Sequence, residues 1–136
     1  MKQTIKILDK RGWIIARQTE DGWKISLTKK GRAELLAYEL GQKGIVKPKK
    51  WDEKWRLLIF DIPEKRRMVR DKIRRFLQSV GFVRLQDSVW VHPYECREIL
   101  NMLRTRYGIH AEALYVRVDS LDGDRWLKRH YGLRNI

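Results

Sequence analysis

Apolar residues from Trp55 onward recur with periods that alternate between strand-like and helix-like. Residues 55–60 (WRLLIF) are nearly continuously apolar, as in a central strand, and residues 63–80 carry apolar residues at helical spacing before Gly81. Two strands, a helix and a last strand are expected next, at residues 82–85, 88–92, 94–107 and 113–119. The order β, α, β, β, α, β predicts an α+β fold, a ferredoxin-like βαββαβ domain with both helices on one sheet face.

The other face of this sheet needs a cover, because a bare apolar sheet face is a site of association. In the last strand, we expect Leu114, Val116 and Val118 to point inward. The aromatic residues expected to fill a two-fold interface on the open face are Phe60, Trp90 and Tyr115. The sequence therefore predicts a homodimer formed through the sheet face.

The N-terminal residues predict a helix, a hairpin and a second helix. The expected elements are a basic helix over 2–10, strands over 13–17 and 23–27 around a turn at 18–22, and a helix over 29–40 that Gly41 ends. Thr28 is expected to cap the second helix. This order resembles the last half of a winged helix-turn-helix. Such a segment is too short to enclose its own core, so it must pack on the second domain or on a partner chain.

These expected elements divide the chain into three parts. Residues 1–45 are expected to be the partial winged-helix segment (helix, β-wing, helix). Residues 46–53, with Pro48 and several lysines, are expected to be a basic linker, and residues 54–136 to be the ferredoxin-fold domain.

Charge narrows the class of partner. The chain has 31 Lys and Arg against 17 Asp and Glu, a net charge of +14. Residues 1–50 carry 13 basic and 5 acidic residues, and residues 51–136 carry 18 and 12, so both parts are basic. This excess predicts a polyanion partner, with solubility alone as the alternative.

Apolar runs and cysteine usage exclude other classes. No apolar stretch approaches the roughly 20 residues that span a bilayer, and the N-terminal residues lack a secretory signal, so we expect a cytoplasmic protein without a membrane partner. The single cysteine, Cys96, excludes an internal disulfide and is expected to be buried.

Four motifs occur in one order: FDIPE at 60–64, RDKIR at 70–74, GF at 81–82 and LQDSVWV at 85–91. They resemble two related families. One is the Cas-like central domain of PaaX-type transcriptional repressors, which follows a winged helix. The other is the small CRISPR-associated ferredoxin-fold endonuclease of the spacer-acquisition complex. The repressor resemblance implies a homodimer that binds duplex DNA as a transcriptional regulator or architectural factor.

The endonuclease resemblance leaves an alternative open. It implies a Mg-dependent endonuclease that acts in spacer acquisition, in the maintenance of CRISPR repeat elements for antiviral defence, together with an integrase partner. A toxin-like or RNA-cleaving ferredoxin domain is a third possibility, since the fold alone does not separate these functions.

Asp61 is the one candidate for catalysis and for metal binding. By resemblance it would hold Mg²⁺ together with its twin across the dimer. The structural alternative is that Asp61 caps the following helix, with Pro63 in the first turn and Glu64 completing a capping box. Whether the chain is an enzyme is left open by its sequence.

The candidate nucleic-acid-binding residues lie in two groups. Arg66, Arg70 and Arg74 recur every four residues on the first helix of the domain, which places their side chains about 6 Å apart. This spacing suits phosphates, and the alternative is a solvated helix face partly paired with acidic residues. The other candidates are Arg67 beside this row, Arg84 by resemblance, and Arg17, Lys24, Lys29 and Lys30 around the wing.

The spacing of the three histidines does not predict a metal-binding site. His92, His110 and His130 lack metal-ligand spacing and are expected at the surface or at helix ends.

Overall fold

Residues 3–133 are the part of the chain that the computed structural model describes. The elements, in chain order, are α1 (Gln3–Lys10), β1 (Ile14–Thr19), β2 (Gly22–Leu27), α2 (Lys29–Lys43), β3 (Trp55–Phe60), the 3-10 helix η1 (Glu64–Arg66), α3 (Arg67–Ser79), β4 (Val83–Gln86), β5 (Val89–His92), α4 (Arg97–Tyr107), β6 (Ala113–Val118) and α5 (Arg125–His130).

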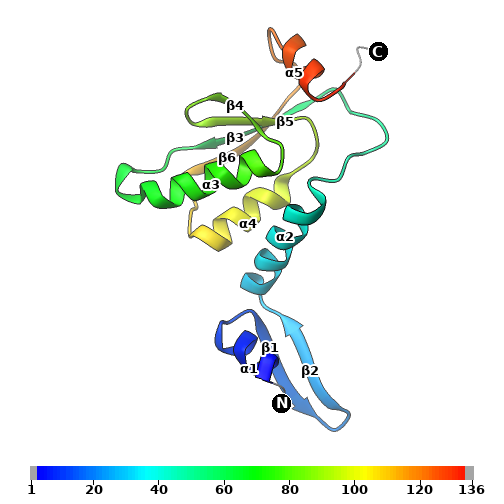
Figure 1. Cartoon of the computed structure of the whole chain (residues 1–136), viewed down its shortest axis with the longest axis vertical. Helices are drawn as coiled ribbons and strands as arrows, with labels where there is room; N and C mark the ends of the chain where they lie inside the picture. The colour runs from blue at the N-terminus through cyan, green and yellow to red at the C-terminus, as the bar shows by residue number, and fades with distance from the viewer. Residues whose placement is uncertain (1–2, 134–136) are drawn as a thin grey trace.

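The main sheet has the strand order β4-β5-β3-β6, with every neighbouring pair antiparallel. Two crossovers through α3 and α4 place both helices on the same face of this sheet (Figure 1). The α+β prediction of a βαββαβ core is therefore confirmed. The β1-β2 hairpin forms a separate two-stranded sheet, and with α1 it projects away from the domain (Figure 1).

The core lies between the sheet and the two helices. Leu58 of β3, Leu77 of α3 and Leu103 of α4 are completely buried there. Ala33, Ala37 and Leu40 of α2 belong to the same core.

Helix α2 thus attaches the N-terminal segment to the domain by packing on α4. Glu34 of α2 also pairs with Arg106 of α4 over 3.4 Å. The expectation that this segment packs on the second domain is confirmed for α2, whereas α1 and the hairpin project away from the domain.

The open face of the sheet carries other residues than those expected. Leu58 lies opposite Trp90 in β5 and Tyr115 in β6, and all three point towards the helices, as Phe60 does. The prediction that Phe60, Trp90 and Tyr115 fill the open face is wrong, because side chains alternate along a strand and these share the parity of the core residue Leu58.

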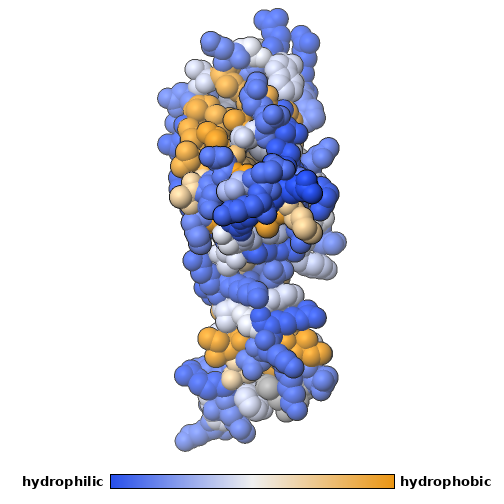
Figure 2. All heavy atoms as spheres, turned by 90° about the vertical axis from the view of Figure 1, so that its left-hand side faces the viewer, coloured by the Kyte–Doolittle hydropathy of each residue, from blue (hydrophilic) through white to orange (hydrophobic). Residues whose placement is uncertain are grey.

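The residues of opposite parity form the open face. The prediction that Leu114, Val116 and Val118 point inward is therefore wrong: all three lie on this face, and Leu114 is 57% exposed there. We call the following residues the open sheet face: Leu57, Ile59, Leu85, Val89, Leu114 and Val116. Figure 2 shows hydrophobic side chains gathered in the upper part of the molecule, where this sheet lies.

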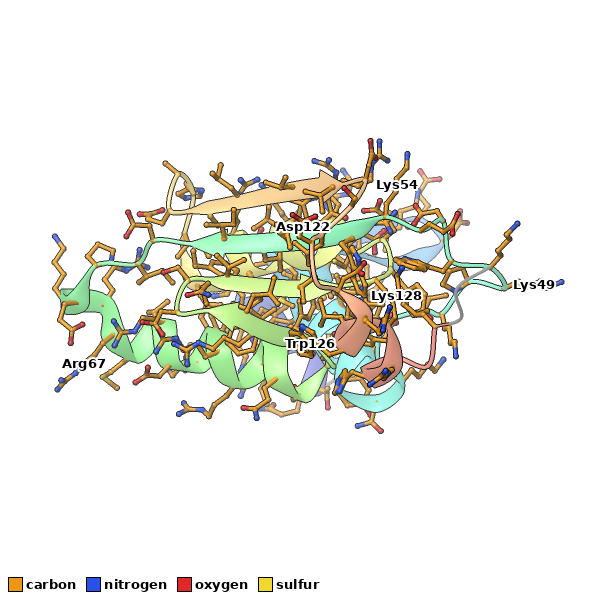
Figure 3. The ribbon with its side chains drawn as sticks, turned by 90° about the horizontal axis from the view of Figure 1, so that it is seen from above. Lys49, Lys54, Arg67, Asp122, Trp126 and Lys128 are labelled. Atoms are coloured by element: carbon orange, nitrogen blue, oxygen red, sulfur yellow. The ribbon has the colours of Figure 1, made fainter. Side chains whose placement is uncertain are left out.

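Helix α5 covers one end of this face. Its Leu127 is completely buried against Trp55 and Val91, and the indole Nε1 of Trp55 donates a hydrogen bond to Asp124 over 2.9 Å. In Figure 3, which views the molecule from above, Trp126 of α5 lies well away from the end of the sheet where Arg67 lies. Leu57 and Leu85 also pack against this cluster, and no further helix or strand within residues 3–133 covers the rest of the open sheet face.

Several element boundaries differ from those expected. The hairpin turn is the two-residue loop at 20–21, because Thr19 pairs with Gly22. Helix α2 continues past Gly41 to Lys43 and ends at Gly44, whose φ of 72° is left-handed. The cap at Thr28 is confirmed, since its side chain accepts a hydrogen bond from the Gly31 N–H over 3.0 Å.

No helix within residues 3–133 is both long and apolar enough to span a bilayer.

Candidate nucleic-acid interface

The wing brings two predicted residues together. Arg17 in β1 lies directly opposite Lys24 in β2, and both side chains are exposed. Their neighbours on this face of the hairpin are Ile15 and Ser26, which are also exposed. The two cations face each other across the ladder, an arrangement that favours an anion between them.

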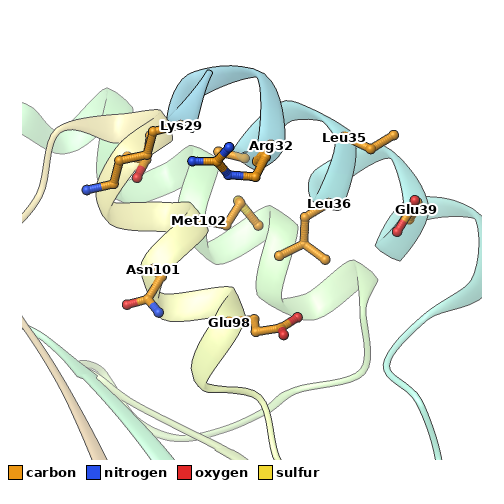
Figure 4. A pocket seen from close by; sticks show the side chains of 10 residues that line it. Lys29, Arg32, Leu35, Leu36, Glu39, Glu98, Asn101 and Met102 are labelled. Carbon is orange, nitrogen blue, oxygen red and sulfur yellow. The ribbon is translucent and has the colours of Figure 1, made fainter. Parts of the chain in front are cut away.

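Lys29 and Lys30 occupy the first turn of α2, and both are exposed. Lys29 borders a groove of about 410 Å³ between α2 and α4 (Figure 4). Lys29 and Arg32 lie at one end of this groove, and Glu39 and Glu98 lie towards the other. The cationic end of the groove is the end closest to the hairpin.

The row of arginines on the first domain helix is only partly available to a ligand. Arg66 lies in η1 and donates hydrogen bonds to the carbonyl oxygens of Tyr107 over 2.7 Å and Gly108 over 3.4 Å. Arg70 donates to the carboxylate of Glu64 over 2.9 Å. The guanidinium groups of Arg66 and Arg70 therefore make contacts within the domain, which leaves fewer of their N–H groups for a ligand.

The exposed cations of α3 lie beside that row. Arg67 is 69% exposed, and its nearest acidic partner, Glu64, is 3.9 Å away. Arg75 and Lys72 are also exposed. Lys72 was missed from sequence, although its place on the polar stripe of an amphipathic helix was the signal that could have identified it.

Arg70, Arg74 and Arg84 converge near the β4-β5 loop. Arg74 donates to the backbone carbonyl of Asp87 over 3.3 Å, and Arg84 reaches the carboxylate of Asp87 over 3.1 Å. Arg74 and Arg84, which are ten positions apart in the sequence, thus contact one loop. This loop contributes Ser88 to a cavity that Arg70 and Arg74 also line.

Asp61 lies at the same cavity, which has a volume of about 210 Å³. The interpretation of Asp61 as a helix cap is wrong. The following helical segment begins with η1, which has Pro63 at its N-cap position and no side-chain cap. Glu64 completes no capping box and pairs with Arg70. The reason is the extended backbone of Pro63, with ψ of 150°, which moves the helix start away from Asp61.

The side chain of Asp61 is therefore available to a ligand. It is exposed, and no partner for its carboxylate exists among the described residues. Its backbone N–H donates to the carbonyl of Glu112 over 2.7 Å, which fixes the position of the residue at the end of β3.

Residues 3–133 of a single copy do not supply a complete metal site. No group of three or more His, Cys, Asp or Glu side chains that could hold a metal ion occurs within residues 3–133. Asp61 has Arg70 and Arg74 beside it at the cavity, and cations disfavour a bound divalent ion. A divalent ion at Asp61 would need further oxygen ligands from a second copy or from a nucleic acid.

His92 and Cys96 are both buried, and burial shifts the pKa of each side chain towards its neutral form. His92 is buried, contrary to the prediction, because it ends an inner strand beside Phe82 and Tyr131. Burial lowers the pKa of His92 to about 4, and its Nδ1 accepts a hydrogen bond from the Tyr94 N–H over 3.1 Å. Cys96 is buried as expected, and burial raises the pKa of its thiol to about 12.

The sequence profile of the PaaX protein central Cas2-like domain matches residues 48–126. No match was found among the curated proteins.

Proposed function

Because the chain belongs to the family of the PaaX central Cas2-like domain, we propose that it binds duplex DNA as a homodimer and acts as a transcriptional regulator or architectural factor. The matched region contains the whole βαββαβ core. The net charge of +14 supports a polyanion partner.

The observation that carries the DNA-binding part is the position of Arg17 directly opposite Lys24. Like charges that face each other across a two-stranded ladder destabilise it unless an anion lies between them. Both side chains project from an exposed hairpin that extends beyond the domain (Figure 1). A backbone phosphate of DNA is an anion that a projecting wing can reach.

The open sheet face supports the homodimer. A contiguous apolar face on a basic protein favours association, and a two-fold axis allows the same face of a second copy to cover it. Because α5 occupies one end of the sheet, the contact would use the other end, around Leu114 and Ile59.

A double neutralisation of the wing tests the DNA-binding proposal. Wild type, Arg17→Gln/Lys24→Gln and a charge-matched control, Arg125→Gln/Arg129→Gln on α5, are titrated into a labelled DNA duplex at about 100 mM KCl. We expect wild type to shift the electrophoretic mobility of the duplex. The wing variant should bind at least about tenfold more weakly, and the control should lose less affinity. Absence of a shift with wild type contradicts the proposal, as do equal losses in the two variants.

A metal-dependent endonuclease with an integrase partner is the second candidate function. The observation in its favour is that Asp61 does not cap a helix and that this exposed residue lines a cavity together with Ser88. Labelled duplex DNA is incubated with Mg²⁺ and either wild type or Asp61→Ala. Cleavage by wild type alone supports this candidate. If both proteins shift the DNA and neither cleaves it, the chain is a binding module.

A further inference from the structure

The groove between α2 and α4 has charges of opposite sign at its two ends. Lys29 and Arg32 lie at one end (Figure 4). Glu39 and Glu98 lie towards the other end, and all four residues are exposed. We call this space of about 410 Å³ the α2-α4 groove. Its own lining therefore has a charge polarity that an occupant has to match.

The charged groups of this lining are largely unpaired. The side chains of Lys29, Glu39 and Glu98 make no hydrogen bond or ion pair with any other residue in the range 3–133. The guanidinium group of Arg32 donates one hydrogen bond, to the carbonyl oxygen of Leu27 over 3.0 Å, so most of its five N–H groups remain available. These four side chains are therefore free to pair with charges on another molecule.

The middle of the α2-α4 groove is apolar. Leu36 of α2 and Met102 of α4 point into the space between the two helices, beside Ala33 (Figure 4). Leu35 lies at the outer edge and is 45% exposed. A helix packed along α2 would remove this apolar surface from water, which favours association.

The order of residues along α2 makes this surface complementary to itself. Arg32, Leu35, Leu36 and Glu39 share one side of the helix, because residues three, four and seven positions apart lie close together on a helix surface. A two-fold axis between Leu35 and Leu36 places a second α2 alongside in the antiparallel direction. Arg32 of each copy then lies beside Glu39 of the other, and Leu35 of each lies beside Leu36 of the other. Two equivalent ion pairs thus flank an apolar centre.

The same charges disfavour other occupants. A phosphate backbone would meet the carboxylates of Glu39 and Glu98 at one end of the groove. A uniformly acidic or uniformly basic helix would be repelled at one end or the other. A second copy carries the required polarity on the identical surface.

We propose that the α2-α4 groove is a contact between two copies of this chain, packed through antiparallel α2 helices. This contact is separate from the open sheet face, because α4 lies on the other side of the sheet (Figure 1). The inference therefore depends neither on the sheet-face homodimer nor on DNA binding.

The contact is expected to be weak. Exposed ion pairs each contribute little, and one helix face is a small interface. Association of free chains should need protein concentrations on the order of 0.1 to 1 mM. Copies that are held together by another contact reach effective concentrations of about this size, which is where the contact would act.

The test uses the full chain with Leu114→Asp as the parent, so that the open sheet face does not contribute. Sedimentation equilibrium up to about 1 mM protein measures self-association, and amide chemical shifts recorded on dilution locate it. We expect concentration-dependent shifts at Leu35, Leu36 and Glu39. Raising the salt concentration to about 1 M should weaken the association, because the ion pairs are exposed.

Charge exchange identifies the pairing. Arg32→Glu sets two carboxylates against each other at both symmetric positions, and Glu39→Arg sets two guanidinium groups against each other. We expect each variant alone to associate at least about tenfold more weakly than the parent. An equimolar mixture of the two restores opposite charges at both positions, so it should associate about as strongly as the parent.

The matched control exchanges charges outside the groove. Arg125→Glu and Asp122→Arg alter exposed residues in and before α5, and each alone should associate as the parent does.

Three results would overturn the inference. They are the absence of self-association up to about 1 mM, losses in the groove variants no larger than in the controls, and a mixture of Arg32→Glu and Glu39→Arg that does not associate.

Discussion

The guanidinium group of Arg66 donates a hydrogen bond to the carbonyl oxygen of Tyr107 over 2.7 Å. Tyr107 is the last residue of α4, so Arg66 satisfies a carbonyl that the helix leaves without an intrahelical partner. Its positive charge also complements the C-terminal end of the helix dipole. Two elements that are far apart in sequence are joined by an arginine that spacing alone assigns to phosphate binding.

Arg66 and Arg67 should therefore respond differently to truncation. Arg66→Ala is expected to lower the free energy of unfolding by about 1–2 kcal/mol and to leave the salt dependence of DNA binding nearly unchanged. Arg67→Ala, at a site that is 69% exposed, should leave stability within about 0.5 kcal/mol and lower the salt slope by about one if it contacts a phosphate. Urea unfolding and salt-dependent DNA titrations measure the two effects. The same stability loss in both variants would contradict this assignment.

The open sheet face predicts the oligomeric state. Leu114→Asp places a charge at an exposed apolar position of this face and should convert a dimer to a monomer, because an unpaired carboxylate is costly to bury. Met68→Asp is the control, since Met68 is an apolar residue of α3 that is 73% exposed. Sedimentation velocity at several protein concentrations gives the answer. A wild type that stays monomeric, or a dimer that survives Leu114→Asp, would count against this interface.

His92 predicts a dependence of stability on pH. Its pKa is about 4 in the fold and 6.5 when unperturbed, so the unfolded chain binds the proton first as pH falls. The free energy of unfolding should decrease from about pH 6.5 towards pH 4, by at most about 1.4 kcal/mol per pH unit for one proton. Asp52 and Glu95 affect stability at lower pH than His92. Hydrogen bonds from Arg56 and Tyr115 lower the pKa values of these two carboxyl groups from their ordinary values of 3.8 and 4.5, so the stability that they contribute is lost as the pH falls below those values.

The variant His92→Asn isolates this effect, because an asparagine oxygen can still accept the hydrogen bond from the Tyr94 N–H. We expect the variant to be less stable than wild type near neutral pH and to lose the slope between about pH 4.5 and 6.5. Chemical denaturation across this window measures it. An unchanged slope in the variant would show that another group titrates.

Two glycines of α2 should give opposite results on substitution by alanine. Gly31→Ala forces a methyl group against the carbonyl oxygen of Trp13 and is expected to disrupt the contact between the hairpin and α2. Gly41→Ala meets nothing and should stabilise the helix by about 0.5–1 kcal/mol. Amide hydrogen exchange of the hairpin residues and thermal unfolding separate the two. Stabilisation by Gly31→Ala would contradict the packing of the hairpin on α2.

The order of elements could be read from the sequence because hydrophobic periodicity determines it locally. The sequence did not show which face of the sheet each strand residue occupies. Trp90 and Tyr115 are aromatic and suit either face, and only the register with Leu58 places them among the helices. Helix starts were also missed, because the backbone of Pro63 and the loop before Arg97 delay them.

The candidate site was predicted in its residue types and only partly in its geometry. The pairing of Arg17 with Lys24 follows from the hairpin and was within reach of the sequence. Arg56 was missed: it is 4% exposed within an apolar strand and pairs with Asp52, and the carboxylate four residues earlier was the available signal. The position of Arg66 at the end of α4 depends on tertiary packing, which spacing along one helix does not contain.

The most direct test of DNA binding through phosphate contacts is the affinity of the wild-type chain for one labelled DNA duplex, measured as KCl is raised from about 50 to 200 mM. The account predicts binding that weakens linearly on a log-log plot, with a slope of about −0.9 for each phosphate contacted and a slope smaller by about two for Arg17→Gln/Lys24→Gln. No detectable binding at the lowest salt, or binding that salt does not weaken, would contradict it.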